Sequence, residues 1–386
     1  MHLFSYCAAV LCFALTLSAC GACQSSGRAT ESPAAAPGDE AYELAGFGES
    51  LPSSARLTYR GMTFAHEGYD GYNGYGGTTV GPSLDSLLKL GVNALAIVPY
   101  TFMREHDKPV PLPIPQREGT ERDVAVIHSI KEAHARGLAV MLKPQIWLGG
   151  GHWPGDIEFR SDAEWEAWAK HYRDYILHYA RMAEAHDVAA LCIGTELVHT
   201  TLERPADWRA TIDAIREVYG GTLTYAANWG EEFENLSFWD DLDAVGLNSY
   251  YPLSRKQNPT NAELLAGARE WMTMANNVAA KAGKPLWLTE VGYRSAKQAW
   301  INPHAGTDGR PVSESCQARS YAAMLRATEE APLLDGIFVW KWPSYLGRVS
   351  GGSWHGDNRV LGTGFCPGGK LAGGVLGEYY LGTKVE

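Results

Sequence analysis

Basic residues are scarce in this chain of 386 residues. It carries 33 Lys and Arg against 44 Asp and Glu, which gives a formal net charge of −11 at pH 7. A protein that binds nucleic acid through a basic surface needs clustered positive charge, so the composition excludes that class. The charged fraction of 20% and the hydrophobic fraction of 45% are those of a folded globular chain, which also excludes disorder over most of its length.

Cysteine is also infrequent, and four of the seven cysteines lie before residue 24. Cys192, Cys316 and Cys366 remain, an odd number that excludes a disulfide scaffold, although a pair between Cys316 and Cys366 stays open. No group of Cys and His has the spacing of a zinc site. The glycine-rich stretch at 68–77 has neither a GxGxxG pattern nor a Walker loop. We therefore expect no metal and no cofactor.

The N-terminus has the features of an export signal. Residues 3–19 are almost all apolar or small, and the run is too short and too early to favour a spanning helix. The run ends in Leu17-Ser18-Ala19-Cys20, which resembles a bacterial lipobox, in which the cysteine becomes the lipidated first residue. This predicts a signal peptide over residues 1–20 and a lipid anchor on Cys20 that holds the exported protein at the bacterial cell envelope or surface. An ordinary signal peptide cut nearby is the alternative, because only His2 precedes the run as a basic residue.

The next segment, residues 21–50, is rich in Ala, Ser, Pro and Gly, as a disordered tether is. Such a tether would keep a folded domain clear of a membrane surface. The folded domain is therefore expected over residues 51–386.

Short apolar and β-branched runs alternate with helical patterns eight times in this domain. This predicts a single (β/α)₈ TIM barrel. A doubly wound open sheet is the alternative fold, and it would normally bring a glycine-rich phosphate loop early in the chain. The stretch at 68–77 is instead expected to be a mobile loop beside the barrel mouth. The predicted strands are 57–65, 92–99, 138–146, 188–195, 222–228, 243–249, 285–290 and 335–341.

Helix starts and faces also have sequence signals. The segment 162–186 carries aromatic and apolar residues at a spacing of three to four, which predicts a helix with one buried face. Three residue pairs have the spacing of a capping box or a close variant and predict helix starts: Thr120 with Asp123, Ser161 with Glu164, and Thr260 with Glu263.

The fourth and seventh predicted strands each end in a glutamate, Glu196 and Glu290. Active sites of TIM barrels lie at the C-terminal ends of the strands, so both carboxylates are expected there. Strict alternation of side chains would turn both into the barrel. The same alternation assigns four preceding residues to the inward set: Cys192, Gly194, Leu286 and Leu288.

Two facing carboxylates suit the cleavage of a glycosidic bond. One donates a proton to the leaving oxygen, and the other attacks the sugar or activates water. Burial and mutual repulsion should raise the pKa of one of them, while the other stays ionised. A separation of roughly 5–5.5 Å would allow a covalent intermediate and retention of configuration.

Four motifs make the chain similar to a known family. Glu at the ends of strands four and seven marks the large clan of retaining (β/α)₈ glycosidases. The chain also carries the motifs IGTEL at 193–197, TYAANW at 224–229, LTEVGY at 288–293 and VWKW at 339–342. With these motifs it resembles, within that clan, glycoside hydrolase family 113 over about residues 55–350. That resemblance implies a retaining endo-β-1,4-mannanase without a metal, in which Glu196 is the acid/base and Glu290 the nucleophile. Thr195 departs from the clan, which usually has Asn there to bind the sugar 2-hydroxyl, so another group must hold that hydroxyl.

Other strand ends supply candidate substrate-binding residues. Lys143 could bind a sugar hydroxyl or tune a carboxylate, or it could form a structural ion pair. In the clan a tyrosine at the end of strand six bonds the nucleophile, and alternation favours Tyr250 over Tyr251. A tryptophan at the end of strand eight usually forms the floor of the cleavage subsite, because flat rings cover the apolar faces of sugars. The full set is Tyr100, Lys143, Gln145, Trp147, Asn228, Trp229, Asn248, Tyr250, Trp340 and Trp342.

The sequence therefore predicts an exported, lipid-anchored retaining glycosidase that acts on a β-linked polysaccharide or oligosaccharide, with β-1,4-mannan as the first substrate. The negative net charge disfavours strongly acidic polymers. Two alternatives stay open at this point. One is an exo-glycosidase or a glycosidase of another β-glycan, including cell-wall polymer. The other is a surface lipoprotein that binds glycans without catalysis.

Overall fold

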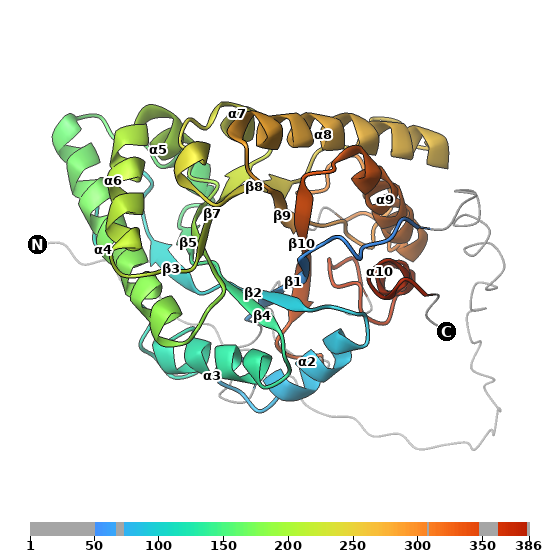
Figure 1. The fold of residues 1–386 in the computed structure, drawn as a ribbon, viewed down its shortest axis with the longest axis horizontal. Coiled ribbons are helices and arrows are strands. Elements are labelled where there is room, and N and C mark those ends of the chain that lie inside the picture. Colours follow the sequence, from blue (N-terminus) through green and yellow to red (C-terminus); the bar gives the residue numbers. More distant parts are fainter. Residues whose placement is uncertain (1–50, 67–72, 307–308, 347–361, 384–386) are drawn as a thin grey trace, which may run out of the picture. The chain divides into compact units, whose positions relative to one another are not determined.

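The computed structural model describes residues 51–66, 73–306, 309–346 and 362–383. Eight parallel strands form a closed barrel in the order β1-β10-β9-β8-β7-β6-β4-β2, and Figure 1 looks into it. Each strand overlaps one of the predicted strands, so the barrel is confirmed and the open sheet is excluded. The predicted signal peptide and tether, with Cys20, lie outside the described residues. The barrel strands are β1 (Tyr59–Ala65), β2 (Ala94–Ile97), β4 (Ala139–Leu142), β6 (Ala190–Thr195), β7 (Thr222–Asn228), β8 (Ala244–Ser249), β9 (Leu286–Val291) and β10 (Leu334–Pro343).

Helices surround the barrel (Figure 1). The described part of the chain also contains three short 3₁₀ turns: η1 (Pro154–Asp156), η2 (Trp239–Asp241) and η3 (Thr328–Glu330). None of the helices in the described part of the chain has the length and apolar character that a membrane span requires. The helices are α2 (Val80–Leu88), α3 (Asp123–His134), α4 (Asp162–Ala185), α5 (Val198–Glu203), α6 (Pro205–Arg216), α7 (Glu231–Asn235), α8 (Asn261–Ala282), α9 (Glu314–Ala327) and α10 (Leu371–Leu381).

Two of the three predicted helix caps are present. The hydroxyls of Ser161 and Thr260 each accept a hydrogen bond from the backbone N–H three residues further on, at the starts of α4 and α8. Thr120 does not cap α3, which was expected from its spacing. Its hydroxyl donates to the carbonyl of Arg117 and closes a turn, and Arg122 occupies the N-cap position.

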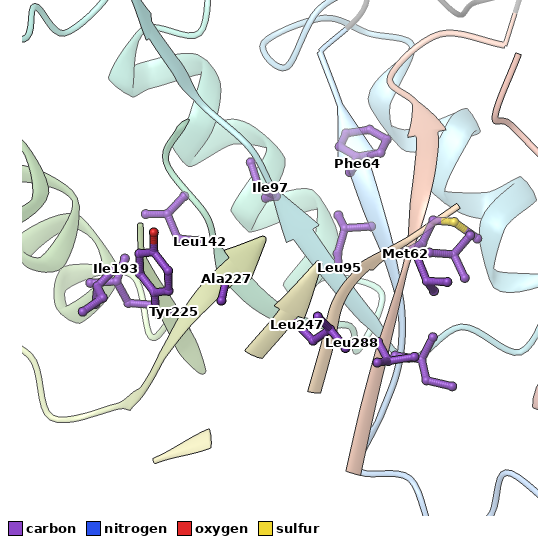
Figure 2. Packing of buried hydrophobic residues seen from close by; sticks show 14 of the residues in the cluster. Met62, Phe64, Leu95, Ile97, Leu142, Ile193, Tyr225, Ala227, Leu247 and Leu288 are labelled. Atoms are coloured by element: carbon purple, nitrogen blue, oxygen red, sulfur yellow. The ribbon is translucent and has the colours of Figure 1, made fainter. Parts of the chain in front are cut away.

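The strands separate two apolar clusters. The cluster inside the barrel is built from small residues with a few large ones: Ala94, Ala96, Met141, Ala190, Cys192, Ala226, Ala244, Trp287 and Phe338. The other cluster is larger and lies between the strands and the helices. Figure 2 shows strand residues of this outer cluster, among them Leu95 and Leu288. Because neighbouring residues of a strand point to opposite faces, the two clusters share the strands between them.

The alternation fails near the ends of β6 and β9. Leu286 and Leu288 belong to the outer cluster, and Trp287 fills the barrel instead. A Cβ on Gly194 would meet the rings of Tyr225 and Trp208 in the outer layer. The expectation that Gly194, Leu286 and Leu288 face inward is therefore wrong, whereas Cys192 does lie inside.

Register shifts explain how the two glutamates still reach the barrel mouth. The pairing of β6 with β7 shifts between Cys192 and Thr195, and the pairing of β9 with β8 shifts where Leu247 gives way to Asn248. A bulge inserts one extra residue and re-aims the side chains that follow it. Glu290 consequently pairs with Asn248 at the end of β9 and turns into the site.

A second, two-stranded sheet extends the barrel wall. β3 (Tyr100–Met103) and β5 (Gln145–Leu148) pair in parallel beyond the C-terminal ends of β2 and β4. The strand predicted over 138–146 is therefore divided in two, with Lys143 and Pro144 between the halves. This extension places aromatic side chains of both strands at the rim of the barrel.

The expected mobile loop is corrected in part, and the open question of the Cys316–Cys366 pair is answered. Part of the glycine-rich stretch, residues 73–77, is described and packed: Tyr75 is fully buried, and its hydroxyl donates to the carbonyl of Phe64 at 2.5 Å. That part is not a mobile loop, and residues 67–72 lie outside the described residues. Cys316 is a free thiol, so it forms no disulfide with Cys366.

Candidate active site

Glu196 and Glu290 line one cleft of about 580 Å³ at the barrel mouth. Glu196 directly follows β6, and Glu290 is the penultimate residue of β9. Both therefore lie at the C-terminal ends of strands, where TIM barrels place their chemistry. The cleft is otherwise lined mainly by aromatic residues: Trp147, Trp153, Asn228, Trp229, Tyr250, His304, Trp340 and Phe365.

Three donors converge on Glu290. Its Oε1 atom pairs with the ammonium of Lys143 and accepts a hydrogen bond from Gln145 Nε2 at 3.1 Å. Its Oε2 atom accepts a hydrogen bond from the hydroxyl of Tyr250 at 2.7 Å. Hydrogen bonds from such donors complement a negative carboxylate and fix its orientation. Lys143 is fully buried, so it forms an ion pair beneath the site and does not reach the open cleft.

Glu196 has different partners. Asn248 Nδ2 donates to its Oε1 atom at 3.0 Å, and the indole N–H of Trp153 donates to its Oε2 atom at 2.7 Å. Burial raises the pKa of Glu196 to about 7, and the negative charge of Glu290 acts in the same direction. The hydrogen bonds from Asn248 and Trp153 act against that rise. At neutral pH this carboxyl group is therefore available as a proton donor.

The backbone at Glu196 is unusual. Its φ angle is +52°, in the left-handed region that side chains other than glycine rarely adopt. Such a conformation costs on the order of 1–3 kcal/mol and persists where the surroundings determine it. The N–H of Glu196 donates to the carbonyl of Ala226 on β7 at 2.9 Å, which ties the strained residue to the neighbouring strand.

The predicted aromatic residues fall into two groups. Trp147, Trp229 and Trp340 line the cleft, and Trp147 is 63% exposed. Tyr100 and Trp342 are absent from its lining. Tyr100 instead lies edge-on to the ring of Trp147, with 6.0 Å between the centroids.

Trp342 is a correction to the sequence analysis, which placed it with Trp340 among the substrate-binding residues because both end the eighth strand. It is buried, and its indole N–H donates to the hydroxyl of Ser83 on α2 at 3.0 Å. The pairing of β10 with β9 shifts between Ile337 and Val339, and its pairing with β1 shifts further along. Alternation along this strand therefore does not predict where its last residues point.

The remaining predicted residues lie close together. Asn228 lines the cleft, whereas Asn248 and Gln145 are buried and hold the two carboxylates. Tyr250 contacts Glu290, as alternation favoured, and the hydroxyl of Tyr251 instead accepts the backbone N–H of Gly230 at 2.8 Å.

Sequence reasoning missed four residues of the site. Trp153 and His304 line the cleft from segments between strands, and Phe365 lines it from the segment between β10 and α10. Thr289 lies below it, and its hydroxyl donates to Asn248 Oδ1 at 2.9 Å, which turns the amide N–H₂ group towards Glu196. Thr289 directly precedes Glu290 in a predicted motif, but only the register of β9 reveals its contact. Among the described residues, no cluster of three or more His, Cys, Asp or Glu side chains could hold a metal ion.

Comparisons with known proteins agree with this geometry. Residues 62–359 match the profile of Glycoside Hydrolase Family 113. The structure is similar to that of a family 113 β-mannanase from Alicyclobacillus acidocaldarius, with 27% identity, a TM-score of 0.72 and coverage of 87% of this chain and 99% of that one. A second solved family 113 β-1,4-mannanase is 22% identical over 84% of this chain and 99% of its own, with a TM-score of 0.72. A family 5 mannosidase from Rhizomucor miehei shares the fold at 12% identity, with a TM-score of 0.56 and coverage of 84% and 92%. No curated protein sequence matches significantly.

Proposed function

The chain belongs to glycoside hydrolase family 113, and from that premise we propose that it hydrolyses β-1,4-mannan with retention of configuration. Its class as a glycoside hydrolase follows from the family. The substrate, the endo mode of attack and the roles of the individual residues are the content of the proposal. The solved family 113 relatives, described as β-mannanases, support mannan as the substrate.

In the first step, a carboxylate oxygen of Glu290 attacks the anomeric carbon while Glu196 gives its proton to the departing glycosidic oxygen. The bond to the leaving sugar breaks, and a glycosyl ester with Glu290 forms. In the second step, the ionised Glu196 takes a proton from water, whose oxygen attacks the same carbon and releases Glu290. Two inversions give net retention.

One observation carries this proposal: two carboxyl groups face one cleft in opposite surroundings. Glu290 is held by three donors, among them a buried ammonium, and suits a charged nucleophile. Glu196 is desolvated, with its pKa raised to about 7, and suits a proton donor. Surroundings that favour the charged form of one carboxyl group and the neutral form of the other assign the nucleophile and the acid.

The sugar 2-hydroxyl needs a partner other than Thr195, which is buried. Asn228 is suited to bind this hydroxyl, because it is the last residue of β7, next to β6, and lines the cleft. In the proposed complex, the amide of Asn228 takes the place that the wider clan gives to the asparagine before the acid/base.

A substrate panel tests the proposed activity. Purified protein is incubated with β-1,4-mannan, β-glucan, β-galactan and peptidoglycan, and the reducing ends and product lengths are followed. We expect mannan to be cut fastest, with oligosaccharides of several lengths appearing early. Release of single sugars alone would favour an exo-glycosidase, faster cleavage of another polymer would change the substrate, and no turnover on any of them would favour a binding protein.

An endo-acting enzyme needs contacts beyond the point of cleavage, and the β3–β5 extension offers them. Phe102 pairs in register with Trp147, so the two side chains share a face of this sheet, and Phe102 is 51% exposed. An aromatic ring contact contributes about 0.5–1.5 kcal/mol beyond area burial, so Trp147→Ala should lower kcat/KM on mannan by roughly 2- to 10-fold. Mannobiosides, which are too short to use the rim, should be affected less. Val124→Ala, an exposed residue on α3, is the control, and an equal loss on long and short substrates would contradict the rim contact.

The pH dependence of kcat/KM should reflect Glu196. Because this residue must be protonated to act as an acid and its pKa lies at about 7, kcat/KM should fall as the pH rises through 7. Trp153→Phe removes a hydrogen bond that stabilises the ionised form, so the pKa should rise and the alkaline limb should move to higher pH. Trp147→Phe is the matched control and should leave that limb in place. Movement of the alkaline limb to lower pH in Trp153→Phe would refute the assignment of that limb to Glu196.

We also propose that the protein is exported and anchored through a lipid on Cys20. The support is the apolar run and the Leu-Ser-Ala-Cys sequence at residues 17–20. In a bacterial host that processes lipoproteins, the full chain should take up labelled fatty acid and sediment with membranes, whereas Cys20→Ser should do neither. Label uptake by the Cys20→Ser variant, or none by the wild type, would remove the anchor from the proposal.

A further inference from the structure

A third buried carboxyl group lies behind the cleft. Glu232, in the short helix α7, is 1% exposed and has no part in the proposed chemistry. Its Oε1 atom accepts hydrogen bonds from the hydroxyls of Tyr225 at 2.7 Å and Thr201 at 2.8 Å. Its Oε2 atom accepts the backbone N–H of Asn228 at 2.6 Å. Among the described residues, no Lys, Arg or His forms an ion pair with it.

The hydroxyl of Tyr225 connects this carboxylate to the acid/base. While it donates to Glu232, its oxygen accepts the backbone N–H of Leu197 at 2.7 Å. Leu197 directly follows Glu196. Glu232 therefore reaches, through one side chain, the peptide bond on the C-terminal side of the acid/base.

That peptide bond needs an external anchor. Glu196 has a positive φ, a conformation that the surroundings must determine. The N–H of Glu196 is bound to Ala226, and the next N–H is the one bound to Tyr225. The two hydrogen bonds fix the backbone on either side of the Cα atom, and the second depends on Tyr225 being held in place.

Tyr225 is packed for this task. Its ring is fully buried and lies edge-on to Trp208 at 5.2 Å between centroids. Its single hydroxyl proton goes to Glu232, which leaves the lone pairs of the oxygen for the Leu197 N–H. A neutral apolar residue at position 232 would leave that proton without this acceptor.

We propose that Glu232 is a positioning residue for general acid catalysis by Glu196. Through Tyr225 it fixes the peptide that follows the acid/base, and thereby the direction from which the proton reaches the glycosidic oxygen. Through Asn228 it ties the same anchor to a residue that lines the cleft. This inference rests on the proposed function, because it takes Glu196 as the acid.

The charge of the network agrees with this role. Burial raises the pKa of Glu232 to about 7, while the hydrogen bonds from Tyr225, Asn228 and Thr201 favour its ionised form. Glu196 is a further acidic group that acts on it, and it raises the same pKa. The groups that face Glu232 are therefore donors from β7 and α5 together with the carboxyl group it is proposed to position.

Leaving-group dependence tests the proposal. Proton donation matters greatly for a poor leaving group and little for a good one. We would measure kcat/KM for a series of aryl glycosides whose leaving groups range from 2,4-dinitrophenol to unsubstituted phenol. The sugar part is the disaccharide whose glycosides the wild type cleaves fastest, which we expect to be mannobiose. Glu232→Leu, which removes the acceptor of the Tyr225 hydroxyl proton, and Tyr225→Phe should each lower kcat/KM for the phenyl glycoside by about 10- to 100-fold and for the dinitrophenyl glycoside by less than about 3-fold. The double variant should lose no more than either single one, because both break the same link.

Two reference variants make the result decisive. Glu121→Leu is the matched control, since Glu121 is also buried with its pKa raised to about 7 but does not line the cleft, and it should leave the whole series unchanged. Glu196→Ala should show the same leaving-group dependence more strongly. If Glu196→Ala does so, and Glu232→Leu and Tyr225→Phe fold by circular dichroism yet slow all leaving groups equally or none, the positioning role is wrong and the proposed function stands. If Glu196→Ala itself shows no such dependence, the proposed acid/base is wrong and the inference falls with it.

Discussion

Glu290→Ala should lower kcat on mannan by a factor on the order of 10⁵, the scale on which enzymes lose activity when a catalytic nucleophile is removed. The variant lacks the atom that is proposed to attack the anomeric carbon. Lys143, Gln145 and Tyr250 would remain, but donors cannot replace a nucleophile. Initial rates on mannan and on an aryl mannobioside measure the loss, with Glu166→Ala on the exposed face of α4 as the control.

Azide distinguishes a lost nucleophile from a disrupted site. In Glu290→Ala the small anion can enter the space of the missing carboxylate and attack an activated aryl glycoside from the same side. The product should be an α-glycosyl azide, with configuration inverted. Residual activity above about one per cent of the wild type, or a β-glycosyl azide as the product, would show that Glu290 is not the nucleophile.

Glu196→Ala should have a different signature. General acid–base catalysis contributes about 10²- to 10⁴-fold, so turnover of mannan should fall by that amount. With a dinitrophenyl glycoside the first step needs little proton donation and should stay fast. The second step still needs the general base, so the glycosyl-enzyme should accumulate and produce a burst of released phenol.

Here azide should accelerate the second step, because it needs no base. Attack on the glycosyl-enzyme gives a β-glycosyl azide, with configuration retained, the opposite of the product from Glu290→Ala. The pair of azide products therefore identifies the two roles in one experiment. Equal losses for every leaving group, without a burst, would contradict Glu196 as the acid/base.

Much of this site could be predicted from sequence because each barrel strand is a short apolar run with a polar end. The runs before Glu196 and Glu290 are strong signals, and the fold brings their ends together. The argument from strict alternation of side chains along β9, however, turned Glu290 into the barrel for the wrong reason. Trp287, and not its leucine neighbours, faces the barrel interior, and a register shift then turns Glu290 inward. One extra residue in a strand leaves no mark in an apolar pattern.

The residues that escaped prediction come mostly from irregular segments. Trp153 and His304 line the cleft from connections between strands, where no periodic pattern indicates the direction of a side chain. Trp342 shows the converse error, since it lies in a strand motif but packs against Ser83 on α2. Partners of the carboxylates such as Lys143 were found because they stand close to a strand end, although their roles needed coordinates.

The left-handed backbone at Glu196 places the stability of the fold and catalytic activity in opposition at one position. A glycine there would adopt the same φ without steric penalty, and an asparagine would tolerate it better than a glutamate does. Selection for a more stable fold alone would therefore replace the residue that is proposed to donate the proton. A screen of random variants for thermal stability should therefore enrich inactive proteins with a substitution at position 196. A search for more stable mannan-degrading enzymes has to measure turnover as well as melting temperature.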